Sequence, residues 1–264
     1  MKRSIGLFIL VLITAVVLIV GWLYYQDRID NAGGAASGSG QQNGGSDDSS
    51  RGGGSESGIN AEGLNAGLQN QLEEAEQSGE PLRLVVAGSD AVTSEGDNSF
   101  PQQLADRIEE NWDGISTEVE TITYDDSTSL EVLNDGGPEE MAGAGADLFI
   151  FVPFAVSDNG TVSSDDTIYA TREITEAVQE NDSAYYISAP QPWYEAQYYL
   201  EQLDAVEGYA DEAGVTYLNH WSAWPAVDDE ELTDYVGEDT PVPTEQGHTA
   251  WTDGIWQHWT ENGS

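Results

Sequence analysis

The stretch LRLVVAGSDAVTSEG, residues 82–96, decides the fold of this chain. Residues 82–87 are aliphatic except for Arg83, which predicts a buried β-strand, and Gly88 opens a turn of small residues. Turns at the carboxyl end of such strands often carry the side chains of a ligand site. Ser89 and Asp90 are therefore the first candidate site residues.

The rest of the domain alternates between short apolar runs and stretches with helical periodicity. Strands are predicted at residues 82–87, 118–124, 147–154, 184–189 and 215–220, and helices at 61–77, 100–111, 130–133, 167–180, 192–213 and 244–260. This order predicts an α/β domain with a five-stranded parallel sheet that is covered by helices on both faces. The expected site lies at the carboxyl ends of the strands, in the loops at residues 88–96, 125–128, 155–159 and 220–225 and in the last loop.

Residues 1–30 predict one transmembrane anchor. The apolar run at residues 5–25 is long enough to cross about 30 Å of hydrocarbon. Lys2 and Arg3 precede the run and Asp27 follows it, which favours a cytoplasmic N-terminus and an extracytoplasmic domain. A cleaved signal peptide is the alternative, but its apolar region would be shorter and a small-x-small site would follow closely.

Composition divides the remainder into three parts. Residues 31–58 are almost wholly Gly, Ser, Asn, Gln and Asp, which predicts a disordered linker. Residues 59–81 contain leucines at positions 64, 68 and 72 and predict an amphipathic lead-in helix. Residues 82–264 form the expected main domain.

The charge of the chain is strongly acidic. It has 7 Lys and Arg against 49 Asp and Glu, a formal net charge of -42. A surface of this kind repels phosphate backbones, so nucleic acid is excluded as a partner. Concentrated salt would screen the self-repulsion, and the charge therefore predicts a protein from a salt-adapted microbe.

No cofactor or metal site is expected from the sequence. The chain has no cysteine, which excludes a disulfide framework, a thiol nucleophile and a cysteine metal site. The acidic pairs at residues 125–126, 165–166 and 228–229 lack the alternating ligand spacing of a calcium loop. They are interpreted as solvated surface.

Two segments at predicted strand ends have a recognisable order. The first reads Gly88, Ser89, Asp90, and the second, YDDSTS, has Asp126 in its third place. This order resembles the SGNH/GDSL hydrolase family, in which the first block is Gly-Asp-Ser with a nucleophilic serine and the second supplies a glycine amide to the oxyanion. Here the serine and the aspartate have exchanged places, and Asp126 stands where the glycine is expected.

Two later segments extend the resemblance as far as the last predicted helix. The family's Gly-x-Asn-Asp block reads AVSD at residues 155–158, with Ser157 in place of the asparagine that donates to the oxyanion. The family's Asp-x-x-His-Pro block reads DTPVP at residues 239–243, with Val242 at the histidine position. The resemblance implies a flavodoxin-like three-layer α/β/α sandwich and a serine esterase or deacylase. With the predicted outward-facing anchor, the expected substrate is a cell-surface acyl ester.

The departures from the family blocks leave the catalytic roles open. Valine accepts no proton, so a nucleophilic Ser89 would need His248 or His220 as its base. Asp158 or Asp239 would then orient that histidine. His248 also matches a second histidine that packs within the family's closing helix, and His220 is equally consistent with a core position.

A carboxylate mechanism and a binding function are the other hypotheses. Asp90 could act as a nucleophile or a base in place of the serine. Alternatively, the fold could be catalytically inactive and bind cell-wall or surface glycan. Trp221, Trp224 and His220 lie beyond a predicted strand end and would form the ligand surface. The stripe of Trp251, Ile255 and Trp259 is expected to be buried core instead.

Overall fold

The computed structural model describes residues 64–237 and 241–261. The strands are β1 (Leu82–Gly88), β2 (Thr117–Thr123), β3 (Leu148–Phe151), β4 (Ala184–Ser188) and β5 (Thr216–Leu218). The α-helices are α2 (Ala66–Ser78), α3 (Phe100–Asn111), α4 (Ser129–Asn134), α5 (Gly137–Ala142), α6 (Ala155–Asp158), α7 (Ser164–Val178), α8 (Tyr198–Ala213) and α9 (Glu245–Glu261). Short 3₁₀ helices lie at η1 (Asp90–Thr93), η2 (Gly96–Asn98), η3 (Trp221–Ala223) and η4 (Glu230–Asp234).

The five strands form one parallel sheet in the order β2-β1-β3-β4-β5. This is the flavodoxin-like order, and it confirms the predicted five-stranded parallel sheet. The register between β1 and β3 pairs Leu84 with Leu148 and Ala87 with Phe151. The turns after these strands therefore meet at one edge of the sheet.

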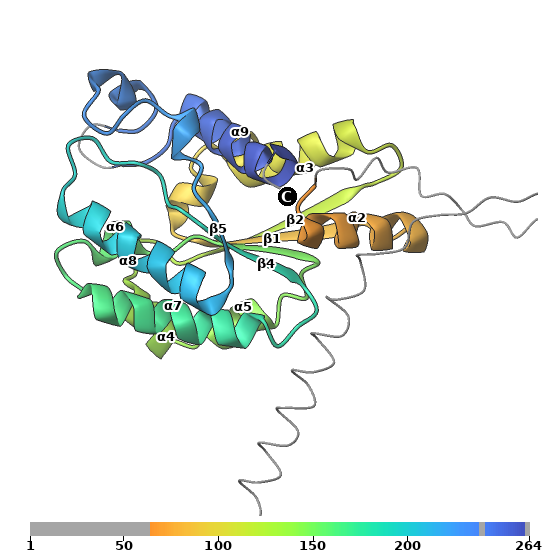
Figure 1. Cartoon of the computed structure of the whole chain (residues 1–264), viewed down its shortest axis with the longest axis horizontal. Helices are drawn as coiled ribbons and strands as arrows, with labels where there is room; N and C mark the ends of the chain where they lie inside the picture. The colour runs from red at the N-terminus through yellow and green to blue at the C-terminus, as the bar shows by residue number, and fades with distance from the viewer. Residues whose placement is uncertain (1–63, 238–240, 262–264) are drawn as a thin grey trace, which may run out of the picture. The chain divides into compact units, whose positions relative to one another are not determined.

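One face of the sheet is covered by α2, α3 and α9 (Figure 1). Leu82, Leu84 and Val86 of β1 point to this face, and they pack in one cluster with residues of all three helices. The stripe of Trp251, Ile255 and Trp259 is fully buried there, as the sequence predicts. The leucines of the lead-in helix belong to the same core as the sheet.

The other face is covered by α4, α5, α7 and α8 (Figure 1). Val85 and Ala87 of β1 point to this face, together with Phe149 and Phe151 of β3. Strands that alternate between two covered faces bury nearly every side chain, which explains the continuous apolar run in β1. The three-layer α/β/α sandwich is thus confirmed.

Several helical details differ from the sequence prediction. The lead-in helix, predicted from residue 61, begins at Ala66 with Asn65 as its N-cap. The helix predicted to begin at residue 192 begins at Tyr198, because the chain from 190 to 197 is a loop held by contacts from elsewhere. Tyr199 Oη donates to the Gln191 carbonyl at 2.6 Å, and Trp221 Nε1 donates to the Pro190 carbonyl at 2.8 Å. The short helices α5 and α6 were not predicted, because they are too short to show a long apolar periodicity.

The predicted anchor at residues 1–30 and the predicted linker at 31–58 lie outside the described residues. Within residues 64–237 and 241–261, no helix combines the length and the apolar character needed to span a bilayer.

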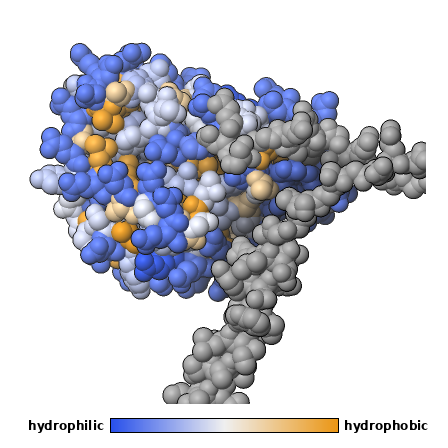
Figure 2. Space-filling view, viewed as in Figure 1, coloured by the Kyte–Doolittle hydropathy of each residue, from blue (hydrophilic) through white to orange (hydrophobic). Residues whose placement is uncertain are grey.

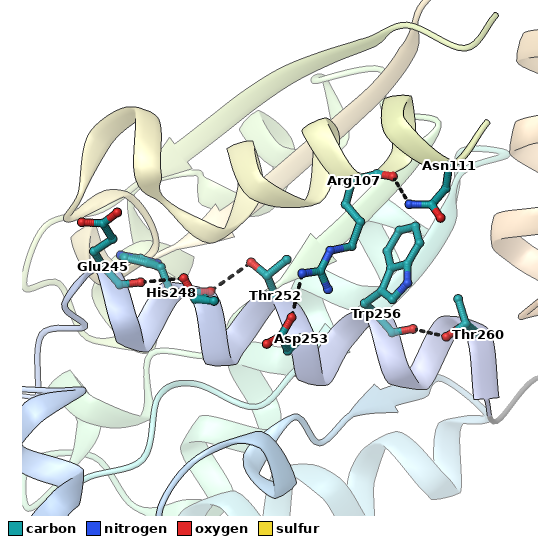
Figure 3. Close-up of polar contacts among 9 residues, drawn as sticks. Arg107, Asn111, Glu245, His248, Thr252, Asp253, Trp256 and Thr260 are labelled. Carbon is teal, nitrogen blue, oxygen red and sulfur yellow. Dashed lines mark hydrogen bonds and ion pairs between the residues drawn. The ribbon is translucent and has the colours of Figure 1, made fainter. Parts of the chain in front are cut away.

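The surface of the domain is largely hydrophilic in the view of Figure 2. Within the described part of the chain, its three arginines all have partners on the body of the fold. Arg83 pairs with Glu120 at 2.9 Å, and Arg172 lies 5.5 Å from the ring centre of Tyr209. Figure 3 shows Arg107 of α3 reaching Asp253 of α9, at 2.7 Å. The three arginines therefore make structural contacts.

Candidate functional site

A cleft of about 670 Å³ lies beyond the carboxyl ends of the strands. Its lining comes from the turns after β1, β2, β3 and β4 and from the segment before α9. The lining residues are Ser89, Asp90, Ala91, Thr93, Ser94, Asp125, Asp126, Val156, Ser157, Gln191, Trp193, Pro241 and Val242. All four segments of the family-like pattern thus contribute to one cavity, whose volume is in the usual range for ligand pockets.

The turn after β1 brings Ser89 and Asp90 to the cleft. Ser89 precedes η1 in an extended conformation, and its side chain makes no capping hydrogen bond. A Cβ on Gly88 would lie 3.0 Å from both the Val152 and the Val92 side chains, so the end of β1 approaches its neighbours closely. The two polar residues that follow this strand end both line the cleft.

Asp90 and Asp125 form a carboxyl pair in the cleft. Partial desolvation and then the like charge of Asp125, which also hydrogen-bonds to it, raise the pKa of Asp90. The backbone of Asp125 has a φ of 42°, in the left-handed region that aspartate tolerates better than most residues. The like charge of Asp125 therefore favours the protonated form of Asp90.

The polar wall of the cleft also includes Asp126, Ser157, Gln191 and Trp193. Gln191 is only 2% exposed, and its side-chain amide donates to the carbonyl of Pro241. Trp193 is partly exposed and packs against the buried ring of Tyr199 at 6.0 Å. Gln191 and Trp193 were not among the site candidates, although the strand-end rule applied to the fourth strand would have found them.

Asp158 does not line the cleft. It is fully buried, where its Oδ1 accepts from the Ser129 backbone N–H at 2.8 Å and its Oδ2 from Thr167 Oγ1 at 2.7 Å. These bonds join the starts of α4 and α7. The residue predicted to orient a catalytic histidine therefore has a structural role in holding two helices together.

Val242 occupies the cleft wall where the resemblance places the histidine. Its side chain is 44% exposed and borders the same cavity as Ser89 and Asp90. Asp239, the other residue of this block with a predicted role, lies outside the described residues. The segment at residues 239–243 therefore lies at the cleft, as the resemblance implies. The valine at the histidine position, however, has no lone pair to accept a proton.

His248 contacts a cleft serine, but not the predicted one. Its Nε2 lies 2.9 Å from Ser94 Oγ, while its Nδ1 accepts the Phe100 backbone N–H at 3.1 Å. Since Nδ1 is an acceptor, the neutral ring carries its proton on Nε2 and donates it to Ser94. Ser94 Oγ in turn donates to the Pro243 carbonyl at 2.9 Å.

In this pair His248 donates a hydrogen bond to Ser94, which is the opposite of the direction that serine catalysis needs. A general base must accept the serine proton at the nitrogen that faces the hydroxyl, and the wrong tautomer of a catalytic histidine lowers the rate by about 10⁴-fold. Burial also lowers the pKa of His248 to about 4, so the ring stays neutral near neutral pH. The pair therefore has a structural role and joins the turn after β1 to α9.

Both ring nitrogens of His220 are hydrogen-bonded in the core. Its Nε2 donates to the Ala189 carbonyl at 2.7 Å, and its Nδ1 accepts from Trp224 Nε1 at 2.8 Å. Burial lowers the pKa of His220 to about 3. The ring also stacks on Trp251 with centroids 4.8 Å apart, so it is a core histidine and does not line the cleft that contains Ser89.

The aromatic loop after β5 does not form the predicted ligand surface. Trp224 is only 7% exposed, in the core beneath α9, and Trp221 donates its N–H to Pro190 while its ring stacks on Tyr199. Neither residue lines the cleft. The expectation of an exposed tryptophan pair is wrong for Trp224, because α9 packs directly over it.

Within the described residues, no histidine lines the cleft and no arginine does. The third histidine, His258, bonds to the Asn219 carbonyl from the late part of α9. No cluster of three or more potential metal ligands occurs in residues 64–237 and 241–261. The chemistry that the cleft offers consists of carboxylates, hydroxyls, one amide and one tryptophan ring.

Comparison of sequences finds no relative: no protein-family model and no curated protein matches the chain. Comparison of structures finds 75 matching chains. One is a protein described as lipolytic and of the G-D-S-L family from Desulfitobacterium hafniense, with a TM-score of 0.53 and 14% identity over 65% of this chain and 96% of that one. TesA has a TM-score of 0.54 and 12% identity, over 66% of this chain and 96% of its own.

The acetylxylan esterase Axe2 from Geobacillus stearothermophilus has a TM-score of 0.56 and 11% identity, over 67% of this chain and 93% of its own. At these low identities the similarity shows a shared backbone fold. The sheet order and the position of the four segments around one cleft agree with this fold. The chain has the fold of the SGNH/GDSL hydrolases.

Proposed function

We propose that this protein is an SGNH-fold binding protein whose cleft holds a cell-wall or surface glycan without hydrolysing it by a serine and histidine mechanism. One observation carries the proposal. The cleft keeps the position and the size of a ligand site, while each described histidine is committed to other groups and Val242 stands at the position of the expected base.

The chemistry of the cleft wall suits a carbohydrate. Carboxylates accept hydrogen bonds from sugar hydroxyls, and serine hydroxyls both accept and donate them. A partly exposed indole offers a flat apolar face to a sugar ring. Asp90, Asp125, Ser157 and Trp193 supply these groups in one cavity. An anionic ligand is disfavoured because no cation of the described residues faces it.

The proposed setting of the domain follows from the rest of the sequence. Residues 1–30 would anchor the chain in the cell membrane with the N-terminus in the cytoplasm, and residues 31–58 would tether the domain outside. The net charge of -42 supports a saline medium, in which the acidic surface is screened. A glycan of the cell's own surface would then be within reach of the cleft.

Replacing Trp193 by alanine is expected to weaken glycan binding at least about tenfold, because the loss of a stacked aromatic face typically costs more than 1 kcal/mol at a binding site. Calorimetric titration of the chain with cell-surface oligosaccharides in molar salt measures the effect. Tyr169→Ala is the matched control, since Tyr169 is 47% exposed on α7 and does not line the cleft. Equal affinities of wild type and Trp193→Ala would contradict the proposed site.

Ester hydrolysis is the second candidate function. It is favoured by the fold and by the position of Ser89 next to Asp90, whose raised pKa marks a perturbed carboxyl in the cleft. In this alternative Ser89 Oγ attacks the acyl carbon of an ester while an ionised carboxylate of the Asp90 and Asp125 pair takes the serine proton. The ester C–O bond then breaks, the proton passes to the leaving alcohol, and water hydrolyses the acyl-serine. The acetylxylan esterase among the similar structures supports an acetylated glycan as the substrate class.

Assays with short-chain aryl esters and acetylated glycans, in molar salt, separate the two functions. We expect no turnover above that of Ser89→Ala, because a carboxylate is a weak base for a serine hydroxyl and Asp126 opposes an oxyanion nearby. Turnover that disappears in Ser89→Ala, with binding and folding retained, would establish hydrolysis instead. Turnover that persists in Ser89→Ala but is lost in Asp90→Asn would assign the carboxyl pair.

A further inference from the structure

We infer that Asn159 is a site of N-linked glycosylation, at which an oligosaccharide is attached to the side-chain amide nitrogen. The inference goes beyond the ligand of the cleft and rests on the proposed extracytoplasmic setting of the domain. It is carried by the triplet Asn159-Gly160-Thr161, by the exposed turn that presents this triplet and by the side chain of the asparagine, which makes no contact that would block the reaction.

The acceptor triplet for N-linked glycans is Asn-x-Ser/Thr, in which x is not proline. It occurs three times in the chain, at residues 159–161, 181–183 and 262–264. Such triplets also arise by chance, and a transferring enzyme must reach both the asparagine amide and the hydroxyl at the third place. Local structure therefore discriminates between the triplets. The one at 262–264 lies outside the described residues.

The first triplet forms a turn between α6 and α7. Asn159 is partly exposed and caps α6 with a φ of -55° and a ψ of 115°, so the chain leaves the helix at this residue. Gly160 has a φ of 77°, and a Cβ there would find no atom within 4 Å. Both Gly160 and Thr161 are exposed. The turn is thus a surface loop of the kind in which attached glycans are accommodated.

The polar side chains of this triplet are available to a partner. Within the described residues, no hydrogen bond involves the side-chain amide of Asn159. Thr161 Oγ1 donates to the Ser157 and Asp158 carbonyls at 2.9 and 3.1 Å. These bonds hold the turn in shape and leave the lone pairs of the hydroxyl oxygen to accept from another molecule. An enzyme can therefore bind the amide and the hydroxyl together.

The second triplet is a matched comparison within the same domain. Asn181 is exposed, but its Nδ2 donates to the Ala142 carbonyl at 2.8 Å, which ties the amide to the end of α5. The hydroxyl oxygen of Ser183 is buried. A hydroxyl that water does not reach is also closed to an enzyme. The structure therefore assigns the modification to Asn159 and not to Asn181.

The transfer forms a C–N bond between Asn159 Nδ2 and the anomeric carbon of an oligosaccharide. The donor is an oligosaccharide carried on a membrane lipid phosphate, and its anomeric C–O bond breaks as the lipid phosphate leaves. Nδ2 gives up one of its protons to a base of the enzyme. Because an amide nitrogen is a weak nucleophile, a membrane-bound oligosaccharide transferase has to catalyse the step. The proposed anchor would keep the acceptor close to this membrane.

Mass spectrometry tests the inference on the full-length chain, purified in non-ionic detergent from the membranes of the cells that make it. Trypsin cuts after arginine, so the fragment of residues 108–172 contains Asn159 and neither of the other triplets. We expect the mass of this fragment to exceed that of the polypeptide by the mass of an oligosaccharide. A second digestion after glutamate separates Asn181 from Asn262, and Asn181 should be unmodified.

Four variants, produced in the same cells, test the assignment to the triplet. Asn159→Gln should remove the added mass from the fragment of residues 108–172, and Asn181→Gln should leave it unchanged. Thr161→Ser keeps the hydroxyl and should retain the modification, whereas Thr161→Val has a similar size without the hydroxyl and should lose it. Circular dichroism in molar salt verifies that each variant is folded. An added mass that survives both Asn159→Gln and Thr161→Val would overturn the inference.

Digestion of intact cells with an external protease separates this inference from the proposed setting. An unmodified fragment of residues 108–172 from a domain that the protease reaches would overturn the inference and leave the membrane topology in place. A domain that is protected from the protease would refute the setting and the inference together. Modification of Asn181 without modification of Asn159 would also overturn the inference. Glycan binding by the cleft is tested independently, by the titration of Trp193→Ala.

Discussion

Gly254→Ala is expected to destabilise the domain by about 4 kcal/mol, more than the usual 1 to 3 kcal/mol for an overpacked core position. Gly254 lies in α9, and a Cβ at this position would meet the carbonyl oxygen, Cβ and Cα of His220 at 2.5, 2.6 and 2.7 Å. Two of these atoms are backbone and cannot rotate away. The helix would have to move off the 220 loop and disturb the stacked rings of His220 and Trp251.

Urea unfolding at constant molar salt measures this effect, and Gly208→Ala is its matched control. Gly208 is an exposed position of α8 where a Cβ would find no atom within 4 Å. Alanine there should stabilise the domain by about 0.5 to 1 kcal/mol, through the lower conformational entropy of the unfolded chain. A Gly254→Ala domain within 1 kcal/mol of the wild type would show that α9 does not need this close approach.

Lowering the pH from 7.5 to 5.5 is expected to reduce the free energy of unfolding by about 3 kcal/mol, through His220 and His248. Burial lowers their pKa values to about 3 and about 4, from the ordinary value of 6.5. Between the folded and unfolded pKa values the unfolded chain binds more protons, so acid favours unfolding. The stabilisation is complete above pH 6.5 and is lost progressively as the pH falls.

Denaturant unfolding at several pH values, with the salt held constant, tests the two histidines. His248→Gln keeps a donor and an acceptor in the side chain but does not titrate, so it should remove about half of the pH dependence. The window ends at pH 5.5 because most carboxyls titrate lower, and their protonation would relieve the repulsion of the acidic surface. A free energy of unfolding that stays constant from pH 7.5 to 5.5 would show that the two rings are not buried in the neutral form.

Local sequence was sufficient for the sheet. The strands at 82–87, 147–154 and 184–189 could be located from short apolar runs, because strands covered on both faces need apolar residues at almost every position. The edge strand β2 alternates instead and is mostly not buried. The helix that begins at Phe100 was predicted with its observed bounds. The start of α8 at Tyr198 was not predicted. The loop before it is held by hydrogen bonds from Tyr199 and Trp221, and the positions of these two residues depend on the complete fold.

The same distinction separates the candidate site into two parts. The rule that sites lie beyond the carboxyl ends of parallel strands predicts that Ser89, Asp90 and Ser157 lie near one another. It did not reveal that Asp90 would meet Asp125. That contact depends on the register of β1 with β2 and on the unusual backbone of Asp125.

The sequence alone determined the order of the strands along the chain, the strand ends that form the cleft, the acidic charge and the valine at the expected histidine position. Only the tertiary structure decided that Trp224 is buried, that Asp158 joins two helices and that His248 and His220 carry their protons on Nε2. A tautomer and a buried ring are set by hydrogen-bond partners that lie far away along the chain. Local propensity does not specify these partners, because packing brings them together only when the layers close.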